Sequence, residues 1–364
     1  MSKVLIVFNH PAPYKVKLFN ELAKHIDLTV IFERDSASDR NKQFYDSKRY
    51  DFKTVKISGL KIGNENIISK GIVKHLKKNQ YDLIVMNGYS TFAEMKAISY
   101  LIKHKIPYTL YINGGIIKEK ESSFRRNLKR KYISNAANYL SPDENSNEYL
   151  AFYGADKSKI YNYPYSTIYS KEVLDKPLSD EEKKNLRLEK SIEEEKVFIS
   201  CGQLIRRKNY FELIKKWKSL DSDYDLYIIG DGEEKNKLQK YIDENNLNNI
   251  HLLGYMSHDD VLKFYRLGDA FVFPSDEDIY GHVINEALSQ GLPVISTKNV
   301  NASKKLIKND YNGYLIDSIC NDELNNTIEK ILANKFAKNA IETAKENTIE
   351  KMVEAHIEIF KKVK

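Results

Sequence analysis

Residues 275–295, SDEDIYGHVINEALSQGLPVI, carry two acids on either side of a Tyr-Gly step, Asp278 before it and Glu286 after it. The apolar run AFVFP just before them predicts a strand, and apolar residues at helical spacing follow. We therefore expect a strand, a loop and then a helix that opens at Gly281. Val283, Ile284, Ala287 and Leu288 would share one face of this helix, and the polar residues His282, Asn285, Glu286 and Ser289 would share the other. Glu286 would lie one turn below His282, while Asp278 would precede the helix start.

The rest of the chain follows the same pattern, in which short apolar strands alternate with amphipathic helices, as in parallel β-α-β units. The series of strands and helices starts a second time at about residue 197. The sequence therefore predicts an α/β protein with two doubly wound, Rossmann-like domains facing each other across a cleft. The predicted strands are 4–8, 28–32, 82–86, 108–112, 197–202, 226–230, 250–254, 270–274 and 293–297.

We expect an N-terminal domain over residues 1–165 and a C-terminal domain over residues 196–345. Residues 166–195 between them are expected to form a linker or insertion, because most of this stretch is polar and highly charged. The helix at about 346–364 is expected to pack back on the N-terminal domain. At 364 residues the chain is long enough for two full cores.

The composition is that of a soluble globular protein, with 41% hydrophobic and 30% charged residues. Cys201 and Cys320 cannot form a disulfide framework or a metal cluster by spacing. No apolar run approaches the roughly 18 residues that a membrane span needs, so we expect a cytoplasmic protein. The net charge of +7 is uneven, since residues 1–165 hold 28 Lys and Arg against 16 Asp and Glu. The N-terminal half is the basic one.

A basic turn, GQLIRRKN (202–209), follows the first strand of the second domain. Lys208, with Arg207 or Arg206 beside it, would neutralise a diphosphate and stabilise it as a leaving group. Taken alone, such a turn is more often just solvated. Its occurrence in the domain that carries the two acids favours a ligand.

These features together suit a nucleotide sugar laid along the helix. A helix start attracts phosphate through its N–H groups and its dipole. The diphosphate would lie at the Gly281 and His282 amides, with the sugar hydroxyls at Asp278 and the ribose at Glu286. For a single acid, the simpler interpretation is a solvated residue or one that favours the helix dipole.

At this point the chain resembles a known family. The order of GQLIRRKN, IIGDGEEKNKL (228–238), LLGYMS (252–257) and FVFPSDEDIYGHVINEALSQGLPVIST (271–297) resembles the C-terminal domain of family-four retaining glycosyltransferases of the GT-B fold. The resemblance extends to PAPYKVKLFNELA (11–23) and INGGIIK (112–118), and so covers most of the chain. The segment with two acids seven residues apart is the specific motif.

The resemblance implies three roles: sugar-hydroxyl binding by Asp278, ribose binding by Glu286 and diphosphate binding by Lys208. The arginine that the family often has shortly before that lysine is Gln203 here, which leaves Arg206 and Arg207 as alternatives. The implied catalytic set is Lys208, Asp278 and Arg207. The implied donor-binding set is Gly202, Lys208, Tyr255, Met256, Asp278, Tyr280, Gly281, His282 and Glu286.

The N-terminal loop departs from the family pattern. Many members have a Gly-Gly turn after the first strand, where this chain has HPAP at residues 10–13. His10 is a candidate to orient the acceptor, although a loop histidine is more often merely solvated. Asn113 and Gly114, which follow a predicted strand, form the other acceptor-side candidate.

The chief basic feature is the segment KEKESSFRRNLKRKYIS, residues 118–134. In a helix, Arg125, Arg126, Lys129 and Arg130 would share a face beside an apolar stripe of Phe124, Leu128 and Tyr132. This pattern suits a peripheral helix on anionic lipid. A core stripe with a solvated basic face is the alternative, and the positive charge of the domain favours membrane contact.

By resemblance, the chain is expected to be a retaining glycosyltransferase that needs no metal or other cofactor. Its partners would be a nucleotide sugar and a glycan or lipid-linked glycan acceptor, in cell-surface or exopolysaccharide synthesis at the inner face of the membrane. For retention, we favour displacement on one face of the sugar. Nucleic acid is not an expected partner, because we identify no motif of base-stacking aromatic residues.

Two alternatives remain open. A nucleotide-sugar 2-epimerase shares the fold, although the segment with the two acids argues against it. A glycosyltransferase-like partner subunit without turnover is favoured by Gln203 and the altered first loop, and disfavoured by Asp278, Glu286 and Lys208.

Overall fold

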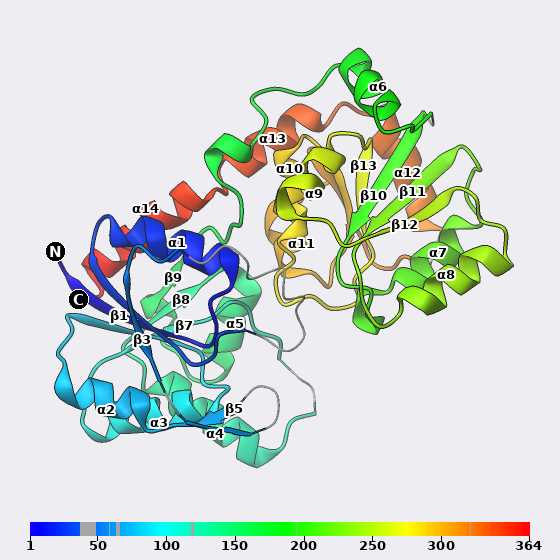
Figure 1. The fold of residues 1–364 in the computed structure, drawn as a ribbon. Helices are drawn as coiled ribbons and strands as arrows, with labels where there is room; N and C mark the ends of the chain where they lie inside the picture. The colour runs from blue at the N-terminus through cyan, green and yellow to red at the C-terminus, as the bar shows by residue number, and fades with distance from the viewer. Residues whose placement is uncertain (37–48, 58, 63–65, 118–119, 194, 321) are drawn as a thin grey trace. The chain divides into compact units, whose positions relative to one another are not determined.

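The computed structural model describes residues 1–36, 49–57, 59–62, 66–117, 120–193, 195–320 and 322–364. Lys118 and Glu119, the first two residues of the basic segment, lie outside the described residues. The chain divides into two compact units (Figure 1). Unit one comprises Met1–Tyr165 together with Ile349–Lys364, and unit two comprises Ser166–Thr348.

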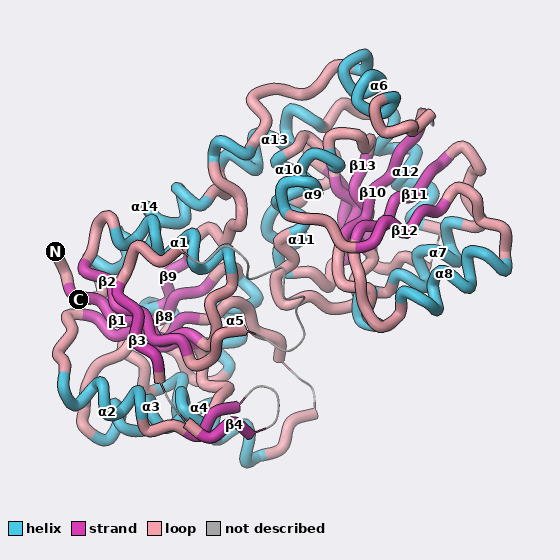
Figure 2. Tube along the Cα trace, viewed as in Figure 1, coloured by secondary structure: helices cyan, strands magenta, loops and turns pink. Residues whose placement is uncertain are grey.

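Unit one is built on a parallel sheet of seven strands in the order β3-β2-β1-β6-β7-β8-β9. The strands are β1 (Lys3–Phe8), β2 (Asp27–Phe32), β3 (Lys53–Lys56), β6 (Leu83–Asn87), β7 (Thr109–Tyr111), β8 (Asn138–Ser141) and β9 (Ile160–Asn162). The central strand β1 is buried along five consecutive residues, because helices cover both faces of the sheet (Figure 2).

The helices of unit one are α1 (Pro13–Ala23), α2 (Gly71–Lys78), α3 (Phe92–Lys103), α4 (Ser123–Ser134), α5 (Glu144–Phe152) and α14 (Ile349–Lys362). A separate antiparallel pair joins β4 (Leu60–Ile62) to β5 (Asn66–Ile68). Helix α14 returns to unit one from the end of the chain and packs on α1. His356 on α14 is buried, and burial lowers the pKa of its imidazole to about 3. It therefore packs as a neutral core residue.

Unit two has a parallel sheet of six strands in the order β12-β11-β10-β13-β14-β15. The strands are β10 (Lys196–Cys201), β11 (Tyr224–Ile229), β12 (Ile250–Gly254), β13 (Ala270–Phe273), β14 (Val294–Thr297) and β15 (Gly313–Ile316). The helices are α6 (Asp180–Leu188), α7 (Tyr210–Trp217), α8 (Lys235–Glu244), α9 (His258–Tyr265), α10 (Val283–Ser289), α11 (Asn301–Leu306), α12 (Glu323–Ala333) and α13 (Ala337–Lys345).

The stretch expected to be a linker is more ordered than its composition suggested. Ser179 caps α6, because its hydroxyl accepts the Glu182 amide while the Glu182 side chain accepts the Ser179 amide. Arg187 on this helix is buried and donates to Asp269 at 2.7 Å and to the Leu267 carbonyl at 2.7 Å. Residues 166–195, as far as they are described, are thus part of unit two rather than a tether.

Both sheets reverse their strand order at one point, between β1 and β6 in unit one and between β10 and β13 in unit two. Ligands of open α/β sheets bind at the carboxyl ends of the strands at such points. Within the described part of the chain, no helix is both long enough and apolar enough to cross a membrane.

Candidate functional site

The strand order of unit two brings the basic turn and the acidic loop together. The turn η4 (Arg206–Lys208) follows β10, and the loop that carries Asp278 follows the neighbouring strand β13. The Arg207 carbonyl accepts hydrogen bonds from the Asp276 amide at 3.0 Å and from the Ser275 hydroxyl at 3.3 Å. The two loops are therefore fastened to each other at the switch point of the sheet.

Lys208 and Asp278 form an ion pair at this point. The Lys208 ammonium donates to Asp278 Oδ2, and both side chains are largely buried. Lys208 Nζ also lies 4.7 Å from the centre of the Phe273 ring. Because a buried charge is costly without a partner, each of the two charges holds the other in place.

Arg207 is the second cation near Asp278. Its Nη1 lies 3.9 Å from Asp278 Oδ1 and donates to the Glu277 carbonyl at 3.1 Å, while its side chain stays 42% exposed. Arg206 is also exposed. The contact with Asp278 favours Arg207 over Arg206 as the residue that assists Lys208.

Gly281 shapes the acidic loop. Its φ is +96°, a conformation that favours glycine, and a Cβ at this position would lie only 2.6 Å from Val300 Cγ1. Asp278 pairs with Val300 in an isolated parallel bridge, and the Ala302 amide donates to the Tyr280 carbonyl at 2.7 Å. This close approach to the start of α11 fixes the loop that presents Asp278 to Lys208.

Helix α10 begins two residues later than expected, at Val283, with His282 as its N-cap residue. The Glu286 amide donates to the His282 carbonyl at 3.1 Å, so Glu286 does lie one turn below His282. The expected polar face is only partly exposed, because Asn285 and Ser289 are fully buried. Asn285 donates to the Asn347 carbonyl at 2.7 Å and to the Ser166 hydroxyl at 3.2 Å, which accounts for its burial.

Glu286 is held from two other elements. Thr167 Oγ1 donates to Glu286 Oε1 at 2.8 Å, and His258 Nδ1 lies 3.9 Å from the same oxygen. His258 begins α9, only two residues after Met256. The turn of Tyr255 and Met256, both in the donor-binding set that the resemblance implies, is therefore adjacent in the chain to a residue that contacts Glu286.

The remaining donor-side candidates differ in exposure. Tyr255 is 42% exposed, whereas Tyr280 is buried with its ring 5.0 Å from that of His282, so Tyr280 supports the loop. Gly202 ends β10 with its amide bonded to the Ile229 carbonyl at 3.0 Å, and a Cβ there would lie 2.7 Å from the Tyr210 hydroxyl. The structure therefore gives Gly202 a packing role.

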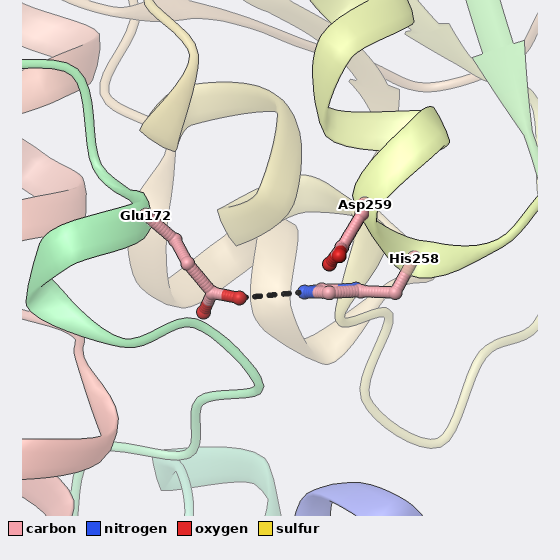
Figure 3. A group of neighbouring side chains, drawn as sticks. All are labelled: Glu172, His258 and Asp259. Atoms are coloured by element: carbon pink, nitrogen blue, oxygen red, sulfur yellow. Dashed lines mark ion pairs between the residues drawn. The ribbon is translucent and has the colours of Figure 1, made fainter. Parts of the chain in front are cut away.

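Three side chains of types that bind metals, Glu172, His258 and Asp259, lie close to one another (Figure 3), and one of them, His258, also approaches Glu286. Glu172 of the turn η3 (Ser170–Glu172) faces His258, with 3.5 Å between its Oε1 and the imidazole Nε2, and Asp259 lies beside them. Their ligand atoms lie within 4.8 Å of one another. The contact between His258 and Glu172 accounts for the proximity of two of these three side chains without a bound metal ion. Sequence spacing gives no signal for this group, because Glu172 is distant in the chain.

The acceptor-side candidates lie at the carboxyl edge of the unit one sheet. The His10 amide donates to Asn9 Oδ1 at 2.9 Å, in the loop after β1. Asn113 donates to Asn87 Oδ1 at 3.0 Å, and Gly114 has a φ of +144°. Asn87 ends β6, while His10, Asn113 and Gly114 lie in the loops that follow β1 and β7, and these three strands are neighbours in the sheet.

A pair of buried carboxyl groups that the sequence motifs did not predict lies at the same edge. Glu33 follows β2 and accepts the Thr91 hydroxyl at 2.8 Å, while Glu94 on α3 accepts the Ser90 and Thr91 amides at 2.8 and 3.0 Å. Burial raises the pKa of Glu33 to about 8, with the charge of Glu94 as the second cause, and burial raises the pKa of Glu94 to about 7. The capping-box spacing of Thr91 and Glu94 was the available signal.

Helix α4 does carry the basic residues, but not as a uniform face. Lys129 forms an ion pair with Glu121 at 2.6 Å and donates to the Tyr153 hydroxyl at 3.1 Å, and Arg126 lies 4.0 Å from Glu121. Arg125 and Arg130 are exposed, and Phe124 is 77% exposed. Two of the four candidate lipid contacts are thus engaged within unit one.

Comparison with solved structures identifies the fold. The chain superposes on Anabaena HepE, solved in complex with UDP, with a TM-score of 0.79 and 17% identity over 99% of this chain and 100% of that one. It has the GT-B fold, which contains two Rossmann-like domains, each with a parallel sheet.

Comparison with families and curated proteins concerns mainly unit two. Residues 181–347 match the family model described as glycosyl transferases group 1. An uncharacterized glycosyltransferase of Methanocaldococcus jannaschii is 24% identical over 82% of this chain and 92% of its own length. The UDP-Gal:alpha-D-GlcNAc-diphosphoundecaprenol alpha-1,3-galactosyltransferase of Escherichia coli is 35% identical over 39% of each chain.

Proposed function

We propose that the protein is a retaining, metal-independent glycosyltransferase that moves a sugar from a nucleoside-diphosphate sugar to a hydroxyl of a glycan. The observation that carries the proposal is the contact between Lys208 and Asp278 at the switch point of unit two. In a nucleotide sugar, the transferred sugar is bonded directly to the diphosphate. A donor site therefore needs a carboxylate for the sugar hydroxyls beside a cation for the phosphate.

Each residue then has a distinct role. Lys208, assisted by Arg207, stabilises the negative charge that grows on the departing diphosphate. The positive charge of Lys208 is already in place before the reaction begins. Asp278 accepts hydrogen bonds from the sugar hydroxyls, and Glu286 accepts those of the ribose. Asp278 is engaged by two cations, which suits hydroxyl binding better than nucleophilic attack.

For retention, we favour displacement on one face of the sugar. The bond between the anomeric carbon and the phosphate oxygen breaks while the bond to the acceptor oxygen forms on the same side. The acceptor proton passes to the departing phosphate oxygen. No metal takes part in this scheme, because Lys208 and Arg207 supply the positive charge.

The acceptor is proposed to be a lipid-linked glycan bound by unit one, for a protein that works at the inner face of the cell membrane. Two observations support this proposal: the excess of basic residues in that unit, and the lipid-linked substrate in the name of the Escherichia coli relative. Exposed Arg125, Arg130 and Phe124 on α4 are the residues proposed to meet the lipid.

A screen of nucleotide sugars tests the proposal. A donor at 100 times its dissociation constant should add about 2.7 kcal/mol to the folded state and raise the melting temperature. Release of the nucleoside diphosphate should then be assayed with glycan acceptors in buffer that contains EDTA. Binding without turnover would identify a partner subunit. Activity lost to EDTA and restored by a divalent ion would overturn metal independence, and would direct attention to Glu172, His258 and Asp259.

Replacement of each of the two acids in turn by its amide should separate the roles of Glu286 and Asp278. Glu286→Gln is expected to weaken both the nucleotide sugar and the free nucleoside diphosphate by roughly tenfold or more, because a hydrogen bond to a charged group contributes about 1.5–3 kcal/mol. Asp278→Asn should weaken the nucleotide sugar and leave the free nucleotide within a few fold. Calorimetric titration measures both. Equal losses for both ligands in both variants would contradict this division.

Binding of unit one to membranes should depend on the exposed arginines of α4. Each basic residue near an anionic surface contributes about 1 kcal/mol, so Arg125→Gln with Arg130→Gln should reduce vesicle binding by roughly 30-fold. The pair Arg126→Gln and Lys129→Gln should reduce it less, because these side chains are engaged with Glu121, and all four changes together should abolish it.

Flotation with phosphatidylserine-containing vesicles at low salt measures this binding, which should fall as salt rises. Wild-type protein that stays with the soluble fraction would show that α4 is only a solvated face.

A further inference from the structure

The segment through which the chain enters unit two lies along the donor-side helix α10. This entry segment, residues 166–174, is bonded to α10 at three levels. Ser166 Oγ accepts Asn285 Nδ2 at 3.2 Å, the Glu172 carbonyl accepts Gln290 Nε2 at 2.7 Å, and the Leu174 amide donates to the Ser289 carbonyl at 2.9 Å. Through these bonds the entry segment covers part of the polar face of α10, including the fully buried Asn285 and Ser289.

Thr167 is the residue of this segment that contacts Glu286. It is 7% exposed, and its hydroxyl donates to Glu286 Oε1 at 2.8 Å. The terminal torsion of a glutamate side chain is broad, with no single preferred rotamer. A hydrogen bond to one carboxylate oxygen therefore fixes the plane of the carboxylate and the direction of its second oxygen.

His258 approaches the same oxygen and is itself held by the entry segment. Its Nδ1 lies 3.9 Å from Glu286 Oε1, and its Nε2 lies 3.5 Å from Glu172 Oε1 (Figure 3). Thr167 acts on Glu286 directly, whereas Glu172 acts through the imidazole. Both belong to the entry segment.

The residues by which the chain leaves unit two meet the same helix. Asn285, next to Glu286, donates to the Asn347 carbonyl at 2.7 Å, and Ser170 Oγ donates to Thr348 Oγ1 at 3.3 Å. Unit one resumes at Ile349. The entry segment and the last residues of unit two thus contact two consecutive residues of α10, Glu286 and Asn285.

We propose that Thr167 is a positioning residue of the donor site, which holds the Glu286 carboxylate in the orientation that binds the nucleoside and thereby couples nucleotide binding to the order of the entry segment. The inference rests on the proposed function of Glu286. Because coupling between two sites is reciprocal, a nucleotide that orders Glu286 must also stabilise the segment that holds it.

The first test compares Thr167→Val, which keeps the shape but removes the hydroxyl, with Thr167→Ser, which keeps the hydroxyl. Calorimetric titration with UDP, GDP and ADP should show a dissociation constant about tenfold higher for Thr167→Val and within threefold of wild type for Thr167→Ser, as expected for loss of a hydrogen bond to a charged group. Ser170→Ala is the matched control, since it removes the bond to Thr348 but leaves Glu286 untouched. Thr167→Ala replaces Thr167→Val if the latter melts early.

A double-mutant cycle shows whether the effect passes through Glu286. In the Glu286→Gln background, Thr167→Val should cost less than twofold, because the two residues would act as one unit. In steady-state assays, Thr167→Val should raise KM with kcat nearly unchanged, as for loss of uniform binding. Full additivity of the two changes would overturn the inference.

Hydrogen exchange provides a readout that a merely structural residue would not change. Nucleotide should slow exchange in residues 166–174 of the wild type and of Thr167→Ser, but not of Thr167→Val. If the wild type binds none of the three nucleotides, the proposed function fails, and the inference with it. If it binds one of them, and Thr167→Val binds it equally well with equal protection, only the inference fails.

Discussion

Replacement of Lys208 by alanine is expected to lower the turnover number by about 10²–10³, which is the effect of losing one preorganised electrostatic contact in an active site. The Lys208 ammonium is largely buried at the switch point of unit two and donates to Asp278. Without it, the departing diphosphate would lose a cation, and Asp278 would keep the more distant Arg207, whose Nη1 lies 3.9 Å from Asp278 Oδ1. Turnover should be measured at saturating donor, beside the melting temperature.

Arg206→Ala is the matched control for this experiment, because Arg206 lies in the same turn and is exposed. It should change turnover less than threefold. Arg207→Ala should have an intermediate effect, since its side chain is 42% exposed and screened by solvent. Near-normal turnover of Lys208→Ala with the natural donor would remove Lys208 from the mechanism.

The free energy of unfolding of unit one is expected to fall as pH rises from about 4.5 to about 8. The cause is the carboxyl pair of Glu33 and Glu94, whose folded pKa values, about 8 and about 7, exceed the usual value of a glutamate. Between those limits the folded state binds more protons than the unfolded state, so ionisation destabilises it. Below the unfolded pKa both carboxyl groups are protonated in both states and do not reduce the free energy of unfolding. Above about pH 8 both are ionised, and the reduction is largest.

The structure shows what faces this pair. Thr91 donates to Glu33, the amides of Ser90 and Thr91 donate to Glu94, and Arg34 is the nearby cation that lowers the pKa of Glu33. In the described part of the chain, Glu33 Oε2 and Glu94 Oε1 are buried without a hydrogen-bond partner. When both groups ionise, the two buried carboxylates repel each other, and these hydrogen bonds and Arg34 offset the cost of burial and repulsion only in part.

Glu33→Gln should remove most of this pH dependence and stabilise unit one at pH 9 by roughly 1–3 kcal/mol, while having little effect at pH 5. Urea denaturation at pH 5, 7 and 9 measures the effect, read from the transition that the substitution shifts. Glu148→Gln, at an exposed position on α5, should leave the slope unchanged. An unaltered slope in Glu33→Gln would show that the pair does not share a proton in solution.

Hydrophobic periodicity alone was sufficient to predict the central strands of both sheets. The nine predicted strands correspond to β1, β2, β6, β7, β10, β11, β12, β13 and β14 within one or two residues at each end. The strands that were missed are β3, β4, β5, β8, β9 and β15, because each has only three or four residues and too short an apolar run to give a signal. Burial does not explain the misses, since β8 and β15 are mostly buried.

Helix α10 shows the limit of a helical wheel. Its spacing predicted an apolar face of Val283, Ile284, Ala287 and Leu288, of which the last three are fully buried and Val283 is half-buried. It also predicted Glu286 one turn below His282, which is confirmed. The same wheel placed Asn285 and Ser289 on the opposite, polar face, whereas both are fully buried. A wheel reports the polarity of a face but does not show whether the entry segment will cover that face and satisfy its polar groups.

Hydrophobic periodicity and short motifs are local properties, and they were enough to predict the two-domain α/β class, the order of the central strands along the chain and the candidates Lys208, Asp278 and Glu286. Which of these residues touch depends on how distant segments pack together. The reversal of strand order between β10 and β13 brings Lys208 against Asp278, 70 residues apart in the chain. Thr167, 119 residues from Glu286, and Glu33, 58 residues from Thr91, became visible only through such contacts. The physical reason is that burial and charge pairing depend on segments distant in sequence, which no local pattern encodes.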